Sequence, residues 1–291
     1  MSSEASHESS LVGQRTVSPH PTVTVVIPAM NEARNLPHVF ADLPADLHEV
    51  ILVDGLSMDD TVSAARRLRH DIKIVRQTRK GKGNALACGF AAATGDIIVM
   101  LDADGSADPA EIPRFVETLR QGADFAKGSR FIKGGGSSDI SRLRRAGNFW
   151  LNKIVNVLYG TDYSDLCYGY NAFWRDCLAD LDLDHSEWIG PEDARMQWGD
   201  GFEVETLINV RIAKARLKVT EVPSFERTRV HGTSNLDAFS DGFRVLRTIR
   251  TERQRWRHRT PALALEAPGR RRIVEAEGRR APIRAKLRRV S

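Results

Sequence analysis

The feature that most constrains the fold is a regular alternation of short apolar runs with longer polar segments between residues 22 and 101. Thr22–Ile27, Glu49–Val53 and Ile72–Val75 are apolar or β-branched runs of strand length, and segments with helical spacing separate them. Strands that alternate with helices of about ten residues form βαβ units, whose right-handed crossovers place the strands parallel in one sheet. We therefore predict an α/β protein with a mostly parallel, Rossmann-like sheet flanked by helices.

The remaining elements follow from the same periodicity and from turn residues. Gly and Ser dominate residues 134–138, which predicts a flexible loop there. The helices are predicted at residues 31–42, 59 or 60 to 69, 83–93, from Pro109 to about Gln121, Ser141–Leu158 and Gly201–Ala215. Asp200 is the predicted N-cap of the last of these helices. A late strand is predicted at Lys218–Pro223.

Two carboxylates one residue apart end the most apolar of these runs. Asp102 and Asp104 follow Ile97–Leu101, a run typical of a strand that is buried on both faces. Open α/β sheets bind ligands beyond the carboxyl ends of their strands, and Gly105 permits the turn through which both carboxylates reach one cation. A hard divalent cation keeps positions for water and substrate phosphates. The pattern therefore predicts a combined metal and diphosphate site, and its alternative is an acidic turn after a core strand.

The two preceding strands also end in polar side chains at the same edge of the predicted sheet. Asn31 and Glu32 follow the first strand, and Asp54 ends the second. Three strand ends with carboxylates form a pocket, whereas a structural explanation needs three separate helix caps. Asp54 fits a base- or ribose-binding role, while Asp59 or Asp60 equally fits the N-cap of the following helix.

A basic turn precedes the small-residue helix at residues 83–93. Arg79, Lys80 and Lys82 stand there with two glycines, without the spacing of a P-loop. Lysines and free backbone amides at a helix N-terminus favour anions. The turn alone is explained as a solvated basic segment, but beside the acidic edge it predicts contacts with a nucleotide diphosphate.

Composition excludes several classes of protein. No apolar run reaches the roughly 18 residues that span a bilayer, and the N-terminal residues do not resemble a signal peptide. Cys88, Cys167 and Cys177 are odd in number and lack metal-ligand spacing. We expect reduced core thiols in a cytoplasmic protein.

The basic charge is concentrated near the C-terminal end. Residues 247–291 hold 15 Lys/Arg and four Asp/Glu, so the rest of the chain is acidic although the whole carries a net charge of +5. Beyond Trp256 the sequence shows no interleaved aromatics for base stacking, and we expect no nucleic-acid partner. The pattern predicts a disordered N-terminus at residues 1–20, a folded domain at 21–250 and a basic, largely disordered tail at 251–291.

Five motifs, in this order, resemble the family 2 glycosyltransferases, and among them the dolichol-phosphate mannose synthases and the bacterial polyprenyl-phosphate glycosyltransferases. The motifs are Ile27–Glu32, Val53–Thr61, Gly81–Ala85, Leu101–Gly105 and Gly128–Gly135. The resemblance implies a GT-A fold, with a nucleotide-sugar and metal half at 21–130 and an acceptor half at 131–250. It also implies an inverting, metal-dependent transfer of a hexose from a UDP- or GDP-sugar to a polyprenyl phosphate.

The resemblance also assigns roles by position. It places Mg²⁺ or Mn²⁺ on Asp102 and Asp104, and it counts Arg130 and Arg229 with them as catalytic. The residues implied for the nucleotide sugar are Pro28, Asn31, Glu32, Asp54, Lys82, Asp102, Ala103 and Asp104, and those for the acceptor are Arg130, Lys133, Arg145, Arg229 and Ser234.

The acceptor half departs from the family's pattern. Asn171 replaces the usual Arg, and Asn235 replaces a final Lys, so two cationic contacts are missing. A soluble saccharide or a small phosphorylated acceptor remains an alternative, as does a non-catalytic scaffold that binds nucleotide sugars. A saccharide hydroxyl would need a positioned carboxylate base, for which Asp200, Glu203 and Glu205 are the candidates. Their other interpretation is a helix cap and exposed helix charges.

The segment Ser141–Leu158 bears on location. It combines Arg and Lys with Trp, Phe and Leu, which fits either a helix in the membrane interface or one packed on the sheet. Together with the basic tail it predicts a cytoplasmic protein that associates with the inner membrane face. The pattern leaves the oligomeric state undetermined.

Overall fold

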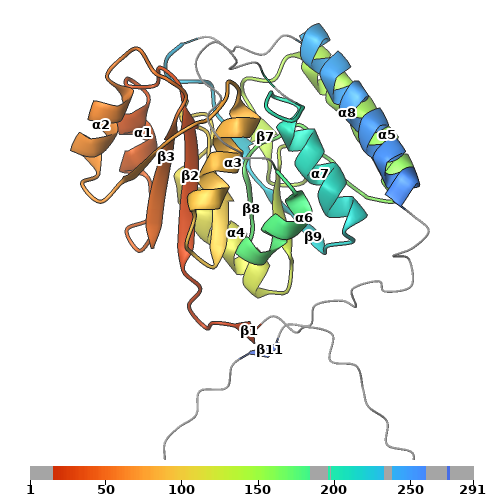
Figure 1. Ribbon diagram of the computed structural model, residues 1–291, viewed down its shortest axis with the longest axis horizontal. Helices are drawn as coiled ribbons and strands as arrows, with labels where there is room; N and C mark the ends of the chain where they lie inside the picture. The colour runs from red at the N-terminus through yellow and green to blue at the C-terminus, as the bar shows by residue number, and fades with distance from the viewer. Residues whose placement is uncertain (1–15, 184–195, 197, 233–237, 260–273, 276–291) are drawn as a thin grey trace, which may run out of the picture. The chain divides into compact units, whose positions relative to one another are not determined.

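A seven-stranded sheet forms the middle of the main folded unit in the computed structural model (Figure 1), which describes residues 16–183, 196, 198–232, 238–259 and 274–275. The strand order is β4-β3-β2-β5-β8-β6-β9, and every neighbouring pair is parallel except those that involve β8. The strands are β2 (Val23–Ala29), β3 (Glu49–Asp54), β4 (Lys73–Arg76), β5 (Ile97–Met100), β6 (Phe125–Ser129), β8 (Asn171–Trp174) and β9 (Val219–Pro223). The α/β prediction is confirmed, and β8 is an antiparallel strand that the sequence did not predict.

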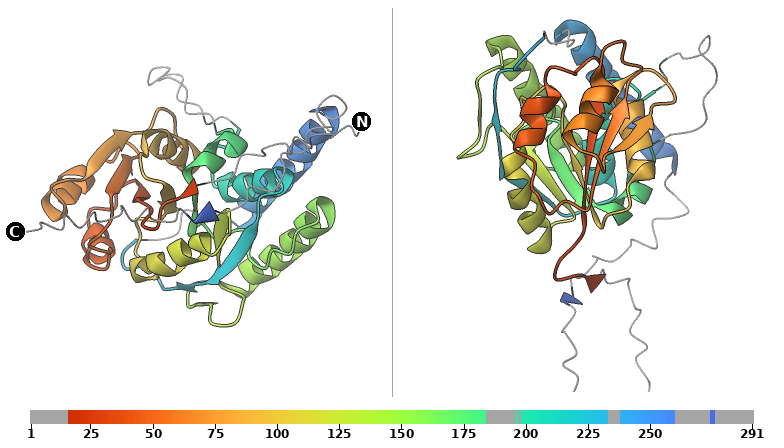
Figure 2. Two further views of the ribbon diagram at one scale, coloured as in Figure 1. Left: turned by 90° about the horizontal axis from the view of Figure 1, so that it is seen from below. Right: turned by 90° about the vertical axis from the view of Figure 1, so that its left-hand side faces the viewer.

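Helices lie on both faces of this sheet (Figure 2), which explains why its central strands are apolar throughout. The α-helices are α1 (Leu36–Ala41), α2 (Thr61–Leu68), α3 (Lys82–Ala92), α4 (Ile112–Arg120), α5 (Arg142–Tyr159), α6 (Leu178–Leu181), α7 (Val204–Lys214) and α8 (Ala238–Arg259). None of the helices in the described ranges is both long and apolar enough to cross a membrane.

The register of the central strands sets the position of the polar strand ends. Ala29 lies opposite Asp54 in the β2–β3 ladder, and Val26 lies opposite Met100 in the β2–β5 ladder. The backbone N–H of Leu101 donates to the carbonyl of Val26, which extends this alignment by one residue. The residues that follow β2, β3 and β5 therefore leave the sheet at one edge, as predicted.

Two predicted helices begin later than expected. Helix α1 begins at Leu36, not at Asn31, because Asn31 has a φ of 60° and the chain first forms turns. Pro37 then occupies the first turn, where its missing N–H is tolerated. Helix α7 begins at Val204, and Asp200 is not its N-cap.

Other corrections concern residues predicted to lack structure. In the segment predicted as a flexible loop, β7 (Gly136–Ser137) pairs in parallel with β10 (Phe225–Glu226). The domain boundary predicted at residue 250 falls inside α8. A separate small unit contains two short parallel strands, β1 (Thr16–Val17) and β11 (Val274–Glu275), within ends that were predicted to be disordered. The rest of both ends lies outside the described residues, apart from residues 18–20 and the last part of α8.

Apart from the core around the sheet, a cluster of apolar side chains joins α5, α7 and α8. Its buried members are Val155, Tyr163, Leu166, Val210, Val245 and Ile249. The hydroxyl of Tyr159 donates to the carbonyl of Ile249 at 2.9 Å, which fixes α5 beside α8. One face of α5 is therefore packed against the protein, but on α7 and α8, whereas the predicted alternative placed it on the sheet.

Candidate functional site

The paired carboxylates lie on the predicted turn after β5. Gly105 has a φ of +76°, a conformation that side chains with a Cβ rarely adopt. Asp104 is buried and accepts a hydrogen bond from the backbone N–H of Ser106 at 2.9 Å. Asp102 is more open, with 36% of its side chain exposed. The turn thus presents one held and one accessible carboxylate at the sheet edge.

Each of these carboxylates contacts a cationic side chain. Lys82 Nζ lies 2.7 Å from Asp102 Oδ1 and 2.8 Å from Glu205 Oε1, while the Arg229 guanidinium lies 2.9 Å from Asp104 Oδ2. Burial alone would lower the pKa of Lys82, but Asp102 and Glu205 raise it above its ordinary value. The site therefore holds a permanent positive charge among three carboxylates.

Gly169 lies directly against this group of charged side chains. A Cβ at this position would lie 3.1 Å from Lys82 Nζ and 3.2 Å from Glu205 Oε1. A side chain at this position would therefore press on the ends of Lys82 and Glu205 and shift them slightly. Gly169 thus lets the two charged groups approach each other closely.

The donor set at this turn fits a hard divalent cation. No group of three or more His, Cys, Asp or Glu residues within the described ranges is arranged to hold a metal ion. Two carboxylates suit a cation such as Mg²⁺, which keeps its other positions for water and substrate phosphates. The chain therefore offers a partial coordination shell of the kind that a diphosphate completes.

The predicted nucleoside-binding residues mostly stabilise turns at the same edge. Asn31 Oδ1 accepts from the N–H of Met58 at 2.8 Å, and Asp54 Oδ1 accepts from the N–H of Ser57 at 3.1 Å. Asp59 accepts from the N–H groups of Thr61 and Ala33 and so connects the two turns, whereas the N-cap of α2 is Asp60, whose side chain makes no capping bond. These bonds join the turns after β2 and β3 into one rigid wall.

We call the turn with Asp102 and Asp104, together with Lys82 and Arg229, the metal edge, after the ion that it is predicted to bind. Glu32 lies beside this edge and also belongs to the wall. Burial raises the pKa of its carboxyl, and the negative charges of Asp104 and Asp102 add to the effect. Its Oε2 accepts a hydrogen bond from the side chain of Asn35. Pro28 lies within β2 and Ala103 is buried between the paired carboxylates, so both shape the edge rather than supply charge.

The basic turn before α3 makes contacts that the sequence did not predict. Arg79 and Asp200, both buried, form two hydrogen bonds of 2.9 Å. The N–H of Gly83 donates to the carbonyl of Asp200 at 2.7 Å, so this helix amide is not free to bind an anion. Of the turn's cations, Lys82 is the one that lines the pocket with Asp102 and Asp104.

The three candidate bases separate in the structure. Asp200 is committed to Arg79, and Glu203 Oε1 accepts from the N–H groups of Gly199 and Gly201. Glu205 instead lines the pocket beside Lys82. Burial raises the pKa of Glu205 while Lys82 opposes that shift. Glu205 is therefore the one of the three with access to a bound substrate.

A pocket of about 250 Å³ connects the metal edge to an apolar wall. Its charged lining consists of Lys82, Asp102, Asp104, Arg130, Asp139, Arg144, Glu205, Glu226 and Arg229. Its apolar side is formed mainly by Ile140, Leu143, Leu151, Phe202 and Val245. One cavity thus joins a site for a charged ligand to a site for an apolar one.

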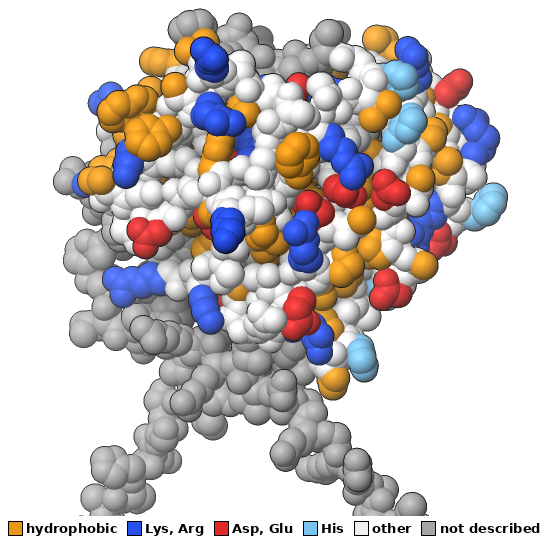
Figure 3. Space-filling model, turned by 180° about the vertical axis from the view of Figure 1, so that it is seen from behind, with side chains coloured by type: hydrophobic (Ala, Val, Ile, Leu, Met, Phe, Trp, Pro, Cys, Tyr) orange, Lys and Arg blue, Asp and Glu red, His pale blue; other side chains and the backbone are white. Residues whose placement is uncertain are grey.

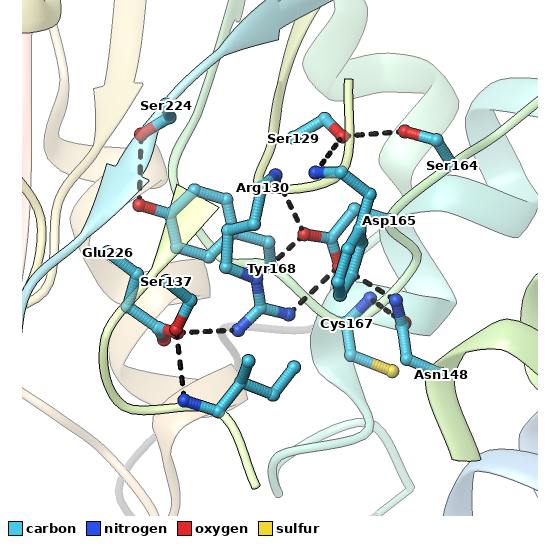
Figure 4. Close-up of polar contacts among 12 residues, drawn as sticks. Ser129, Arg130, Ser137, Asn148, Ser164, Asp165, Cys167, Tyr168, Ser224 and Glu226 are labelled. Carbon is cyan, nitrogen blue, oxygen red and sulfur yellow. Dashed lines mark hydrogen bonds and ion pairs between the residues drawn. The ribbon is translucent and has the colours of Figure 1, made fainter. Parts of the chain in front are cut away.

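Arg130 occupies the middle of a buried cluster within this pocket (Figure 4). Its guanidinium makes two hydrogen bonds of 2.7 and 2.9 Å to Asp165 and a third of 2.9 Å to Glu226. The ring of Tyr168 lies 4.8 Å from the guanidinium carbon, and Asn148 donates to Asp165 at 3.1 Å. The two carboxylates outweigh burial and raise the pKa of Arg130.

Of the other predicted acceptor residues, Arg229 lines the pocket, but Lys133 and Arg145 do not. Both Lys133 and Arg145 are exposed. The Arg145 guanidinium lies 5.6 Å from the ring of Phe131, and its neighbour Arg144 lines the pocket instead. Ser234 lies outside the described residues.

Several residues at the site were missed by the sequence analysis. Asp165 and Glu226 hold Arg130, but they lie 35 and 96 residues away from it, and no local motif marks them. Cys167 is exposed and lines the pocket, which corrects the prediction of three core thiols, while Cys88 and Cys177 are buried as expected.

Comparisons with known proteins agree with this architecture. The model of the family described as Glycosyl transferase family 2 matches residues 24–181. The undecaprenyl-phosphate mannosyltransferase of Micrococcus luteus is 30% identical over 237 residues, which cover 78% of this chain and 93% of that protein. The dolichol-phosphate mannosyltransferase of Pyrococcus furiosus is 30% identical over 224 residues, which cover 74% of this chain but only 59% of the longer relative.

A solved structure shares the fold. Glucosyl-3-phosphoglycerate synthase from Mycobacterium tuberculosis, in complex with Mn²⁺, UDP and glucosyl-3-phosphoglycerate, has a TM-score of 0.60 and 23% identity. The match covers 80% of each chain. The mostly parallel sheet, the metal-type edge and the family match lead to one conclusion: the chain belongs to glycosyltransferase family 2 and is a glycosyltransferase with the GT-A fold.

Proposed function

We propose that this glycosyltransferase transfers a hexose from a UDP- or GDP-sugar to a polyprenyl phosphate, with a divalent cation at the donor site. The observation that carries the proposal is the pocket, where Asp102, Asp104, Lys82 and Arg229 stand at one side and aliphatic side chains at another. Two relatives at 30% identity are named as mannosyltransferases of polyprenyl phosphates. The matched structure from M. tuberculosis was solved with Mn²⁺ and UDP.

The metal edge supplies the donor chemistry in this proposal. Asp102 and Asp104 would hold Mg²⁺ or Mn²⁺, which when bound neutralises charge on the departing nucleoside diphosphate. Lys82 and Arg229 add two fixed cations beside that leaving group. Preorganised charges of this kind stabilise a transition state without rearranging during the reaction. Asn31, together with Pro28, Glu32, Asp54 and Ala103, would form the wall against the nucleoside and sugar.

The apolar wall supplies the acceptor side. Leu143, Leu151 and Val245 line the pocket and fit an isoprenoid chain. A phosphate monoester is largely ionised near neutral pH and needs little help from a base. Attack on the sugar face opposite the leaving group would invert the anomeric centre. Arg144 would meet the acceptor phosphate, since its one ion pair, with Asp139 at 3.4 Å, is partly exposed, whereas Arg130 is held by two buried carboxylates.

One observation favours a soluble acceptor as the second candidate. Glu205 lines the pocket, and the raised pKa of its carboxyl suits a general base for a hydroxyl nucleophile. The matched structure is named for a phosphorylated, water-soluble product, although at 23% identity it supports the fold alone. The two candidates differ in whether Glu205 is needed for transfer.

The test is donor turnover with a panel of UDP- and GDP-hexoses, Mg²⁺ or Mn²⁺, and either polyprenyl phosphate or small phosphorylated acceptors. We expect release of nucleoside diphosphate that depends on both the metal and the lipid phosphate. Turnover with only the soluble acceptors would replace the lipid by the second candidate. Donor binding without transfer to either acceptor class would contradict both.

A further inference from the structure

Helices α5 and α8 carry most of the exposed large apolar side chains of the described residues. Seven of the 13 such side chains belong to these two helices. We call them the α5–α8 surface: Leu143, Phe149, Trp150, Ile154 and Val157 of α5, with Phe243 and Leu246 of α8. Single exposed apolar residues are ordinary on soluble proteins, but a gathered set marks an interaction site.

The apolar residues of α5 form a stripe along its outer side. Leu143, Trp150 and Val157 are seven residues apart, and Ile154 fills the interval, so all four share one helix face. Trp150 is 66% exposed and Val157 is 82% exposed. The residues of α5 that are buried against the protein lie on its opposite side. The outer stripe therefore has no packing partner within the described part of the chain.

The inner side of α5 is satisfied separately. Asn152 donates to the carbonyl of Ser164 at 2.6 Å, Asn148 bonds Asp165, and Val155 is fully buried in the cluster with α8. The packing of α5 on the protein therefore does not explain its outer stripe. The membrane-interface alternative therefore concerns only the outer face of this helix.

Cationic side chains flank the stripe. Arg142, Arg144, Arg145 and Lys153 lie on α5, which contains no acidic residue. Arg247 and Arg250 are exposed on α8, whereas one of its two acidic residues, Glu252, is buried and paired with Lys214 at 2.7 Å. Seen from behind, apolar and basic side chains adjoin at the upper left, where α5 lies (Figure 3). Arg144 pairs with Asp139 at 3.4 Å, just before the helix, which leaves the cations in excess. The surface thus combines exposed aromatic and aliphatic groups with net positive charge.

We propose that the α5–α8 surface docks the protein on an anionic phospholipid bilayer. An amphipathic helix with Trp and Phe on one side and Arg and Lys beside them binds at the headgroup boundary, and anionic lipid attracts its cations. A second copy of the chain is a poorer occupant. In a two-fold interface the same patch meets itself, so the cations of α5 would face cations.

The docking surface continues into the active-site pocket. Leu143 belongs to both, and Gly147, Leu151 and Val245 of the same two helices line the pocket. A protein docked on this side would open its apolar pocket wall toward the bilayer. This step rests on the proposed function, since it gives a membrane-borne acceptor a direct route to the metal edge.

The test is flotation of the full chain with vesicles of phosphatidylglycerol and phosphatidylcholine that contain no acceptor lipid. We expect wild type to bind these vesicles, and to bind pure phosphatidylcholine weakly. The double variant Trp150→Gln, Val157→Gln should lose about tenfold in vesicle affinity, because insertion of each apolar side chain is lost. Leu68→Gln on α2, which lies at the opposite side of the domain (Figure 1), is the matched control and should bind as wild type does.

Two results would overturn the docking proposal. One is unchanged binding of the double variant, which would assign the affinity to the basic residues beyond α8. The other is an absence of wild-type binding to the anionic vesicles. A concentration-dependent dimer in sedimentation velocity that the double variant abolishes would then assign the surface to a second copy of the chain. Vesicle binding without lipid-dependent transfer would leave the docking intact and contradict only the proposed acceptor.

Discussion

The metal edge and the Arg130 cluster use the same chemical groups in opposite ways. At the edge, 36% of the Asp102 side chain and 25% of the Arg229 side chain are exposed, so a ligand can reach both ions. In the cluster, Arg130 is 4% exposed and Asp165 is fully buried. Accessible pairs can exchange their partners for a substrate, whereas a buried pair cannot be opened without leaving a charge uncompensated. The edge is thus suited to catalysis, and the cluster to holding the acceptor half together.

This contrast separates two possible roles of Arg130. The family resemblance implies that it binds a substrate phosphate, whereas its buried contacts indicate that it holds the fold together. Arg130 was predicted to hold the acceptor or donor phosphate, but three hydrogen bonds to carboxylates already engage it. We infer that Arg130 mainly fixes β6 against the β10 strand and the loop before β8.

The largest expected effect is on stability, from Arg130→Met. The substitution leaves Asp165 and Glu226 buried without their cation, which costs about 3–5 kcal/mol in the free energy of unfolding. Urea denaturation of the purified variant measures this loss. Adding Asp165→Asn should recover part of it, because the buried negative charge is removed. A loss below about 1 kcal/mol for Arg130→Met would show that the cluster does not hold the fold.

The next effect is on rate, from Asp104→Ala. Removing one of the two carboxylates at the metal edge should lower sugar transfer by at least about a hundredfold, as does the loss of other preorganised electrostatic contacts to a transition state. Circular dichroism and the unfolding midpoint should stay close to wild type, since Arg229 keeps access to water. Asp71→Ala, at an exposed carboxylate that pairs only with Arg69, serves as control. Undiminished transfer in Asp104→Ala would remove the metal edge from the mechanism.

A smaller effect separates the two acceptor classes, through Glu205→Gln. With a polyprenyl phosphate nucleophile we expect transfer to fall less than about tenfold, because little base catalysis is required. A general base for a hydroxyl would contribute about 10²–10⁴-fold. The measurement is kcat for both acceptor types at saturating donor. A large loss would favour the soluble saccharide acceptor and would extend the catalytic role from the metal edge to α7.

The smallest effect is a pH dependence of stability at the junction of α7 and α8. Burial acts to raise the pKa of Glu252, but hydrogen bonding from Lys214 and the charge of Arg211 bring the net pKa below its ordinary value. A carboxylate with a lowered folded pKa stabilises the protein above its unfolded pKa of about 4.5, and this contribution is lost as the pH falls through the folded value. Glu252→Gln should therefore cost about 1–2 kcal/mol near pH 7 and less in acid. Thermal unfolding from pH 7 to pH 3 tests this, and an equal loss at both ends would contradict it.

The positions of the polar residues at the sheet edge could be predicted from the sequence because these residues directly follow the strands that position them. Asp54, Asp102 and Asp104 needed only the assumption of parallel neighbours, which the ladder register bears out. The buried ion pairs could not be predicted in the same way. Arg130 meets Asp165 and Glu226, and Arg79 meets Asp200, across separations of 35 to 121 residues, which no local pattern in the sequence reveals.

The same reason explains the wrong helix start at α7. The polar run Asp200-Gly201 was interpreted as a cap because local capping is the commonest use of Asp before a helix. In the structure this carboxylate pairs instead with the buried guanidinium of Arg79. The long-range ion pair therefore overrides the local capping propensity of Asp, and a single sequence does not reveal such a pair.

The most direct test of the account is the equilibrium binding of UDP and GDP to the wild-type chain, measured by calorimetry with Mn²⁺ and with EDTA. The same titrations are made on the variant Asp102→Asn, Asp104→Asn. We predict that the metal tightens binding of one of the two nucleotides at least about tenfold in wild type, and that the variant loses this difference. Equal binding with and without the metal in wild type, or a metal effect retained by the variant, would contradict a metal-dependent donor site on these two carboxylates.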